Sequence, residues 1–288
     1  MDFSSLLPDI KPWVQSLAQV WPAPIIKASS WMFPIIQTFH LLALVTLGGA
    51  VLLPSLRLMG AGMTSVSPAS IEKTVRPWMW AALIVLVLTG LLMGLVNPMR
   101  LYTRPGFLIK MIALAAALIF SFGVVGPLSR CHGAASGATR IWAIAGLIVW
   151  IAAILVFASS FGAAPGSFHV ICVGWLVVMG LGSRTTRIVL GAITALIAIG
   201  VGIVTYGVFT PLEDYDIVME INRWTLRCSA LLVAGFALWE FVRPRPNAPT
   251  GNAMANPTLA RLAGLGAILA WFTVAAAGRW IGLGGGAG

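Results

Sequence analysis

The sequence predicts an all-α integral membrane protein with about eight transmembrane helices, arranged as two parallel four-helix repeats after an N-terminal interfacial helix. Apolar residues make up 59% of the 288 residues and charged residues only 9%, whereas a soluble domain carries about 25% charged residues. Segments of about 20 residues that are nearly free of charge recur along the whole chain, and each is long enough to cross a bilayer. The third observation is that landmarks of the first half recur, in the same order, in the second half.

The first segment, residues 1–30, is predicted to lie along the membrane interface. It carries Trp13, Trp21, Lys11 and Lys27 together with several prolines, so it is amphipathic and too polar to span the bilayer. No basic leader precedes a short apolar core here, and we therefore expect no cleavable signal peptide.

Eight apolar spans are expected after this segment. Their approximate limits are 33–53, 78–97, 107–127, 141–161, 167–183, 187–209, 224–242 and 260–281. The fifth span is short and rich in glycine. The stretch at 244–257, which is rich in proline and asparagine, is predicted to be a polar loop, and the tail at 284–288 is predicted to be flexible.

The recurring landmarks predict one four-helix repeat at 31–162 and a second at 163–283. Phe39-His40 opens one apolar segment, and Phe168-His169 opens another of the same kind. Five residues of the first half have a counterpart of the same or a similar type 113 positions later. The pairs are Gly94 and Gly207, Pro98 and Pro211, Tyr102 and Tyr215, Lys110 and Arg223, and Arg130 and Arg243. Four spans per repeat is an even number, so the two copies have parallel topology around an axis along the membrane normal. Equivalent residues then lie at equal depth.

The distribution of basic residues predicts a multi-pass protein of the bacterial inner (plasma) membrane with both termini in the periplasm. Eight spans place both termini on one face. The opposite face carries Arg57, Lys73, Arg76, Arg130, Arg140, Arg184, Arg187, Arg243, Arg245 and Arg261. The positive-inside rule makes that basic face cytoplasmic. The net charge of +10 therefore indicates orientation in a lipid bilayer, and we expect no nucleic-acid partner.

One histidine per repeat lies within the membrane, and these two histidines define the candidate site. The repeat places His40 and His169 at similar depth, toward the periplasmic face. Two neutral imidazoles on facing helices are the axial ligands of a low-spin b-type haem, and they also suit copper or zinc. The alternative is that each imidazole is a packing residue bonded to a neighbouring carbonyl. With one intramembrane histidine per repeat, the chain offers at most one bis-histidine haem.

Lys110 and Arg223 form a second equivalent pair beside the histidines. Ionisable residues inside a membrane are costly and indicate function by default. The two cations are predicted to neutralise haem propionates, or to hold an anionic substrate or a quinone headgroup. The alternative is that each long side chain only reaches up to the lipid headgroups.

A series of short motifs lies between Trp31 and Lys110. The motifs are Phe33-Pro34, Thr38-Phe39-His40, Leu56-Arg57-Leu58-Met59-Gly60, Thr89-Gly90 and Phe107-Leu108-Ile109-Lys110. In this order they resemble a family of bacterial inner-membrane proteins that is related in pattern to copper-resistance protein D (CopD)-like membrane proteins. The resemblance covers roughly the first third of the chain. It implies a multi-span inner-membrane protein whose periplasm-facing histidine site serves copper handling or redox chemistry. The chain lacks the dense methionine and histidine content of a dedicated copper conduit.

Together these features predict a membrane electron-transfer protein, or the membrane subunit of a periplasm-facing oxidoreductase, with one b-type haem between His40 and His169. Electrons would pass between a periplasmic redox protein or dehydrogenase subunit and the quinone pool. The sequence shows no soluble catalytic domain, which favours an electron-transfer or anchoring subunit over a self-sufficient enzyme. Two alternatives stay open: a transporter of copper or of a small anion, and a non-catalytic membrane scaffold.

Overall fold

The computed structural model describes residues 2–161, 163–205, 215–242, 254–255 and 257–283, and every regular element in these ranges is a helix. The longer helices are α4 (Met32–Met59), α5 (Pro68–Val96), α7 (Pro105–Leu118), α9 (Gly137–Phe161), α10 (Ala163–Leu181), α11 (Arg184–Thr205), α12 (Tyr215–Val242) and α13 (Pro257–Leu283). The expected all-α architecture is confirmed. The expected loop at 244–257 and tail at 284–288 lie almost wholly outside the described residues.

Six helical segments of the described chain are long and apolar enough to cross a membrane. They are Met32–Met59, Pro68–Val96, Pro105–Arg130, Gly137–Phe157, Arg184–Ile203 and Pro257–Arg279. These segments coincide with six of the expected spans and confirm a membrane-spanning chain. The other two expected spans, 167–183 and 224–242, fall on α10 and α12, and their passage through the membrane stays a prediction.

The N-terminal segment forms several short pieces rather than the single interfacial helix that we expected. Its α-helices are α1 (Phe3–Leu6), α2 (Lys11–Ser16) and α3 (Ala23–Ala28), which are separated by 3₁₀ turns. Prolines recur through this stretch, and each one removes a backbone donor and clashes with the preceding turn. The prolines at these breaks are Pro8, Pro12, Pro22 and Pro24.

These short helices pack at one end of the long ones. The hydroxyl of Tyr102 donates to the carbonyl of Leu7 at 2.6 Å, and the rings of Phe3 and Phe107 lie 5.8 Å apart. Trp13 and Trp21 remain largely exposed, as tryptophans at a membrane interface commonly are. The expected interfacial position of this segment is therefore compatible with its packing.

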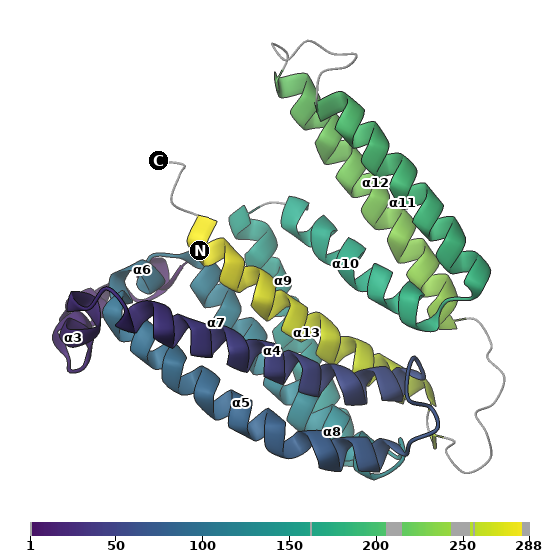
Figure 1. The fold of residues 1–288 in the computed structure, drawn as a ribbon, viewed down its shortest axis with the longest axis horizontal. Coiled ribbons are helices and arrows are strands. Elements are labelled where there is room, and N and C mark those ends of the chain that lie inside the picture. The colour runs from purple at the N-terminus through teal and green to yellow at the C-terminus, as the bar shows by residue number, and fades with distance from the viewer. Residues whose placement is uncertain (1, 162, 206–214, 243–253, 256, 284–288) are drawn as a thin grey trace. The chain divides into compact units, whose positions relative to one another are not determined.

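The chain divides into two compact units, which are described separately. Unit 1 comprises Met1–Ser160 and Ala248–Gly288, and unit 2 comprises Phe161–Asn247. The first boundary falls close to the expected junction of the repeats. However, α13 belongs to unit 1, where it packs against α4 and α7 and lies alongside α4 in Figure 1. The contact units thus combine parts that are not consecutive in the chain, and the two repeats expected at 31–162 and 163–283 stay a prediction.

Small residues let α13 approach its neighbours closely in unit 1. A Cβ atom at Gly264 would lie 2.5 Å from the carbonyl oxygen of Ser55 on α4, and one at Gly106 on α7 would lie 3.0 Å from that of Ala277 on α13. Close backbone approach through small residues is the usual way in which membrane helices gain packing energy. Buried alanines fill the rest of this contact, among them Ala113, Ala116, Ala117, Ala260, Ala263, Ala267 and Ala270.

Helix α7 continues through a π-helical stretch, η3 (Ile119–Val125), into α8 (Gly126–Arg130). Trp271 on α13 donates its indole N–H to the hydroxyl of Ser121 at 2.8 Å, and Trp150 on α9 donates to Thr273 at 3.1 Å. These bonds satisfy polar groups within an otherwise apolar core, where an unpaired donor is costly. They tie α13 to both η3 and α9.

In unit 2, α12 packs against both α10 and α11. Val178, Leu190 and Val233 form its buried core. A Cβ atom at Gly174 on α10 would lie 2.5 Å from a side-chain carbon of Val233, so the contact between α10 and α12 depends on that glycine.

Candidate functional site

His40 lies in the N-terminal third of α4, and its partly buried side chain contacts α5. Its Nδ1 atom is 2.9 Å from Oγ1 of the buried residue Thr89. The Thr89 hydroxyl donates to the carbonyl of Val85, one helical turn back, at 2.6 Å, which is a common use of threonine within a helix. Because the hydroxyl proton is used there, Thr89 accepts a hydrogen bond from His40. This assigns the imidazole hydrogen to Nδ1.

The Nδ1–H tautomer leaves Nε2 of His40 with a lone pair. A histidine that binds a metal or haem iron commonly donates its other ring N–H to a fixed acceptor, which sets the tautomer and the orientation of the ring. Thr89 is placed to be that acceptor. This arrangement directs Nδ1 of His40 toward Thr89 and leaves Nε2 as the other ring nitrogen with acceptor capacity.

Gly90, the neighbour of Thr89, allows this close approach of the imidazole to α5. A Cβ atom at Gly90 would lie 3.4 Å from Cε1 and 3.9 Å from Nδ1 of His40. A methyl group there would make ordinary van der Waals contact with the ring, and only a side chain larger than that of alanine would press on it, so the Thr89-Gly90 pair supplies both the acceptor and the space.

Lys110 on α7 lies at the same end of unit 1. Its side chain is partly buried, and its Nζ atom would be 3.9 Å from a Cβ atom at Gly278 on α13. The ammonium is close enough to His40 for the two groups to interact electrostatically. No ion pair between described residues involves Lys110. A positive charge on this ammonium, beside the imidazole, would attract an anionic group and repel a metal cation.

The other two predicted site residues, His169 and Arg223, lie in unit 2. The backbone of His169 belongs to α10, but its side chain lies outside the described residues, so the pairing of the two histidines stays a prediction. Arg223 on α12 forms an ion pair with Glu220 at 3.4 Å, and both side chains are more than half exposed. A carboxylate of the same helix therefore already neutralises part of the charge of Arg223.

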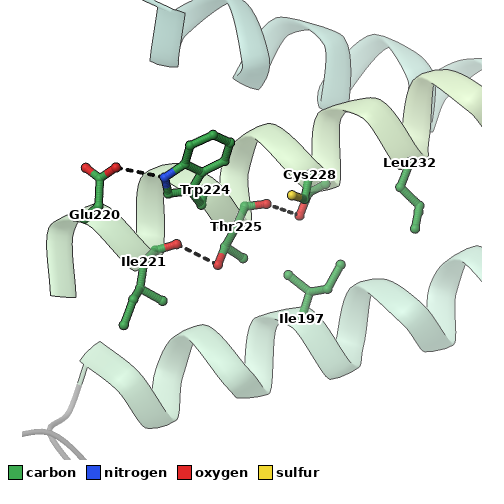
Figure 2. Close-up of a pocket in the computed structure, with 8 residues that line it drawn as sticks. Ile197, Glu220, Ile221, Trp224, Thr225, Cys228 and Leu232 are labelled. Atoms are coloured by element: carbon green, nitrogen blue, oxygen red, sulfur yellow. Dashed lines mark hydrogen bonds between the residues drawn. The ribbon is translucent and has the colours of Figure 1, made fainter. Parts of the chain in front are cut away.

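Glu220 also accepts a hydrogen bond from Trp224, whose indole nitrogen is 2.8 Å away. The guanidinium of Arg227 lies over the Trp224 ring, 5.0 Å from its centroid. Figure 2 shows Glu220 and Trp224 at a groove of about 450 Å³ between α11 and α12, which is otherwise lined mainly by apolar side chains such as Ile197 and Leu232. Because its lining is mainly apolar and Glu220 is already bonded to Trp224 and Arg223, we assign no catalytic role to this groove.

A second charged cluster, which the sequence motifs did not predict, lies at the opposite end of unit 1. Glu72 on α5 is 4% exposed. Arg76 donates to it from Nε at 2.9 Å and from Nη2 at 2.5 Å, and Arg130 at the end of α8 donates from Nη1 at 2.7 Å. A signal was present in the sequence, because Glu72 is one of the few acidic residues on a basic face. A buried acidic residue in such a setting needs cationic partners.

Among the described residues, no three histidine, cysteine, aspartate or glutamate side chains converge as a metal centre. The two polar clusters of unit 1 consist of different groups and so differ in chemistry. One pairs an imidazole with a cation, and the other pairs a buried carboxylate with two guanidinium groups.

The fold and these clusters define a helical membrane protein with an ionisable site at each end of its first unit. Residues 27–168 match the model of a family described as a family of unknown function (DUF6644). The match covers both clusters of unit 1 and ends at Phe168, directly before His169. No curated protein and no solved structure matches the chain.

Proposed function

We propose that this chain is a membrane electron-transfer protein, or the membrane subunit of a periplasm-facing oxidoreductase, in which His40 is an axial ligand of one b-type haem. We assign the second axial position to His169, its counterpart in the repeat. The observation that carries the proposal is the hydrogen bond from Nδ1 of His40 to Thr89, which leaves Nε2 available as a ligand. Haem, when bound, supplies one-electron chemistry at a potential that its axial ligands and surroundings set.

The residues around His40 suit this task because they exclude water from one side of the imidazole. Ala43 and Leu47 follow His40 along the same face of α4, and Leu86 precedes Thr89 by one turn on α5. All three are buried in the apolar core of unit 1. Because the acceptor Thr89 is buried, the hydrogen bond from His40 lies in a region of low dielectric, which strengthens it.

Lys110 favours haem over copper at this position. Its ammonium stabilises a carboxylate such as a haem propionate, whereas it raises the cost of placing a copper ion beside His40. The sequence assigns the same role to Arg223. Arg223 pairs with Glu220, so Lys110 is the cation on which the proposal draws.

The proposed partners follow from the end of the bundle at which His40 lies. The charge pattern orients that end toward the periplasm, so a periplasmic redox protein or dehydrogenase subunit is the expected partner there. A quinone in the bilayer is the expected partner from the membrane.

A second candidate function, transport of a small anion, draws on the same lysine. Lys110 has no carboxylate partner among the described ion pairs, and an intramembrane cation of this kind can serve as an anion-binding group. Uptake of an anion into proteoliposomes that disappears in Lys110→Met would support this candidate over electron transfer.

Visible spectra of the detergent-purified full chain and three variants test the proposed function. His40→Ala and His169→Ala should each remove the reduced b-type bands, because each removes an axial ligand. His132→Asn is the control, since His132 lies in an exposed turn with a positive φ of 47° that asparagine tolerates. Bands that persist unchanged in both ligand variants, in protein that elutes as a single species, would rule out the assignment.

A further inference from the structure

Glu72, Arg76 and Arg130 line a cavity of about 230 Å³ at the end of unit 1 opposite His40. The three groups carry two positive charges and one negative charge, so the cavity has an excess of one positive charge. Both arginine side chains are 44% exposed, whereas the glutamate side chain is 6% exposed. The carboxylate is thus enclosed, and the guanidinium groups face accessible space.

The two guanidinium groups retain hydrogen-bond donors that Glu72 does not use. Arg76 bonds to Glu72 through Nε and Nη2, and Arg130 bonds through Nη1. Each guanidinium has five N–H donors in a planar fork. Three of these donor groups are not used in any hydrogen bond of the described residues. They are Nη1 of Arg76 and both Nε and Nη2 of Arg130.

The remaining walls of the cavity are mostly apolar. Trp80 on α5 and Phe122 on η3 lie with their ring centroids 4.7 Å apart, and Met79 and Val125 add further apolar surface. The π-helical turn carries Phe122 to this cavity, and such turns occur frequently at functional sites. A cationic end beside an apolar wall suits a ligand that joins an anionic group to a hydrocarbon chain.

The sequence pattern predicts that both arginines lie near the level of the lipid headgroups, toward the ends of the apolar helical segments Pro68–Val96 and Pro105–Arg130. The apolar spans predicted from the sequence cover 78–97 and 107–127, so Arg76 and Arg130 fall just outside them on the same face. A guanidinium at that predicted level would meet the phosphate groups of the adjacent lipid leaflet rather than hydrocarbon.

We propose that this cavity binds the phosphate group of an anionic phospholipid between Arg76 and Arg130, with part of an acyl chain along Trp80 and Phe122. Arginine binds phosphate through paired N–H donors, and basic pockets between transmembrane helices are known places of headgroup binding. A purely structural role, in which Glu72 ties α5 to α8, explains the bonds to the carboxylate. It does not explain the unused donors or the cavity beside them.

Lipid retention by the purified full chain tests this proposal. The protein is titrated with phosphatidylglycerol, phosphatidylcholine or inorganic phosphate, and bound lipid is counted by native mass spectrometry while thermal stability is followed. We expect one phosphatidylglycerol to be retained in preference to phosphatidylcholine, with little effect of inorganic phosphate. Equal retention of the two lipids, or stabilisation by inorganic phosphate that matches that by phosphatidylglycerol, would overturn the assignment to a lipid.

Variants then locate the site. Arg76→Gln and Arg130→Gln should each lower the occupancy of phosphatidylglycerol about fivefold, the effect expected for one basic residue at a membrane surface. Lys73→Gln is the matched control, because Lys73 is exposed on the same face but does not line the cavity. Val125→Phe is a second test of the same site and should also lower the retention of phosphatidylglycerol. The larger side chain takes up part of the cavity, and all three charges are kept. Unchanged phosphatidylglycerol retention in Val125→Phe and in either arginine variant would contradict the proposal.

Discussion

At the residue scale, one hydrogen bond gives an intramembrane imidazole a defined tautomer. Thr89 accepts from Nδ1 of His40 while its own hydroxyl donates within α5. A histidine that served only to hold helices together would need no particular free nitrogen. The bond therefore links the local chemistry of α5 to the ligand role proposed for His40.

Replacing Thr89 by valine should weaken the proposed haem site without changing its shape. Valine matches threonine in volume but cannot accept from Nδ1–H, so His40 loses its fixed tautomer. We expect haem affinity to fall about 10- to 100-fold, the usual cost of losing a partner of a ligating histidine, and Thr89→Ser to restore it. The measurement is haem titration of the apoprotein. Thr46→Val is the control, because Thr46 is exposed and bonds only within α4. An affinity that Thr89→Val does not alter would show that the tautomer of His40 has no role.

Lys110 should control the reduction potential of the same site. A nearby ammonium favours the reduced haem, which carries one positive charge fewer, so Lys110→Met should lower the midpoint potential by on the order of tens of millivolts. Lys110→Arg should keep the potential close to that of the wild type. Potentiometric titration measures both, and Lys27→Met, on α3, serves as the control. A potential that rises in Lys110→Met would contradict this role.

The sequence could predict His40 and Lys110 as candidates because ionisable residues stand out in apolar spans. It could not predict the partners of these residues. Thr89 lies 49 positions from His40, and Glu72 lies 58 positions from Arg130. Such contacts depend on how neighbouring helices are rotated about their axes, and apolar periodicity is weak in spans that face lipid on one side and protein on the other.

At the scale of the helices, α13 determines how unit 1 is built. The sequence predicted its limits well, since a charge-free run of about 20 residues indicates a span wherever it occurs. Its position beside α4 and α7 was not predictable from chain order, because a membrane helix packs where small residues permit close contact. The glycines at that contact were the available signal, but glycine is frequent throughout the chain.

A methyl group at Gly264 should therefore destabilise unit 1. Its Cβ atom would lie 2.5 Å from the carbonyl oxygen of Ser55 and 2.9 Å from Cγ of Met59, so α13 has to move away from α4. Gly264→Ala should cost about 1–3 kcal/mol, as overpacking of a close contact usually does. Thermal unfolding in detergent measures the effect. Gly48→Ala, also within a long helix but with nothing within 4 Å of its Cβ position, should cause no loss, and equal stability of both variants would contradict the close contact.

At the scale of the whole molecule, composition and apolar run lengths were enough to predict an all-α membrane protein. They gave the approximate limits of the long helices, because the thickness of the bilayer sets their length. They did not predict the division into contact units. Helix α13 belongs to the first unit, although α10, α11 and α12 precede it in the chain and belong to the second. Which helices pack together depends on side-chain shape in three dimensions, and the order of spans does not specify it.

The orientation of the chain gives a prediction at this scale. The exposed residue Cys131, after α8, should lie on the cytoplasmic side, because basic residues cluster on that face. In a Cys172→Ser, Cys228→Ser background, a membrane-impermeant maleimide should label Cys131 only after spheroplasts are lysed. Thr103→Cys, at the exposed end of α6 (Pro98–Tyr102), should react in intact spheroplasts when Cys131 is replaced by serine. The reverse pattern would invert the proposed orientation and move the His40 end to the cytoplasm.

The proposed function is tested most directly by a dithionite-reduced minus air-oxidised spectrum of the full chain, purified from haem-replete cells, with haem and copper quantified in the same sample. We predict the sharp reduced bands of a bis-imidazole b-type haem and one haem per chain. A folded protein that shows no reducible Soret band, and that does not take up added haem, would contradict the assignment of His40 as a haem ligand.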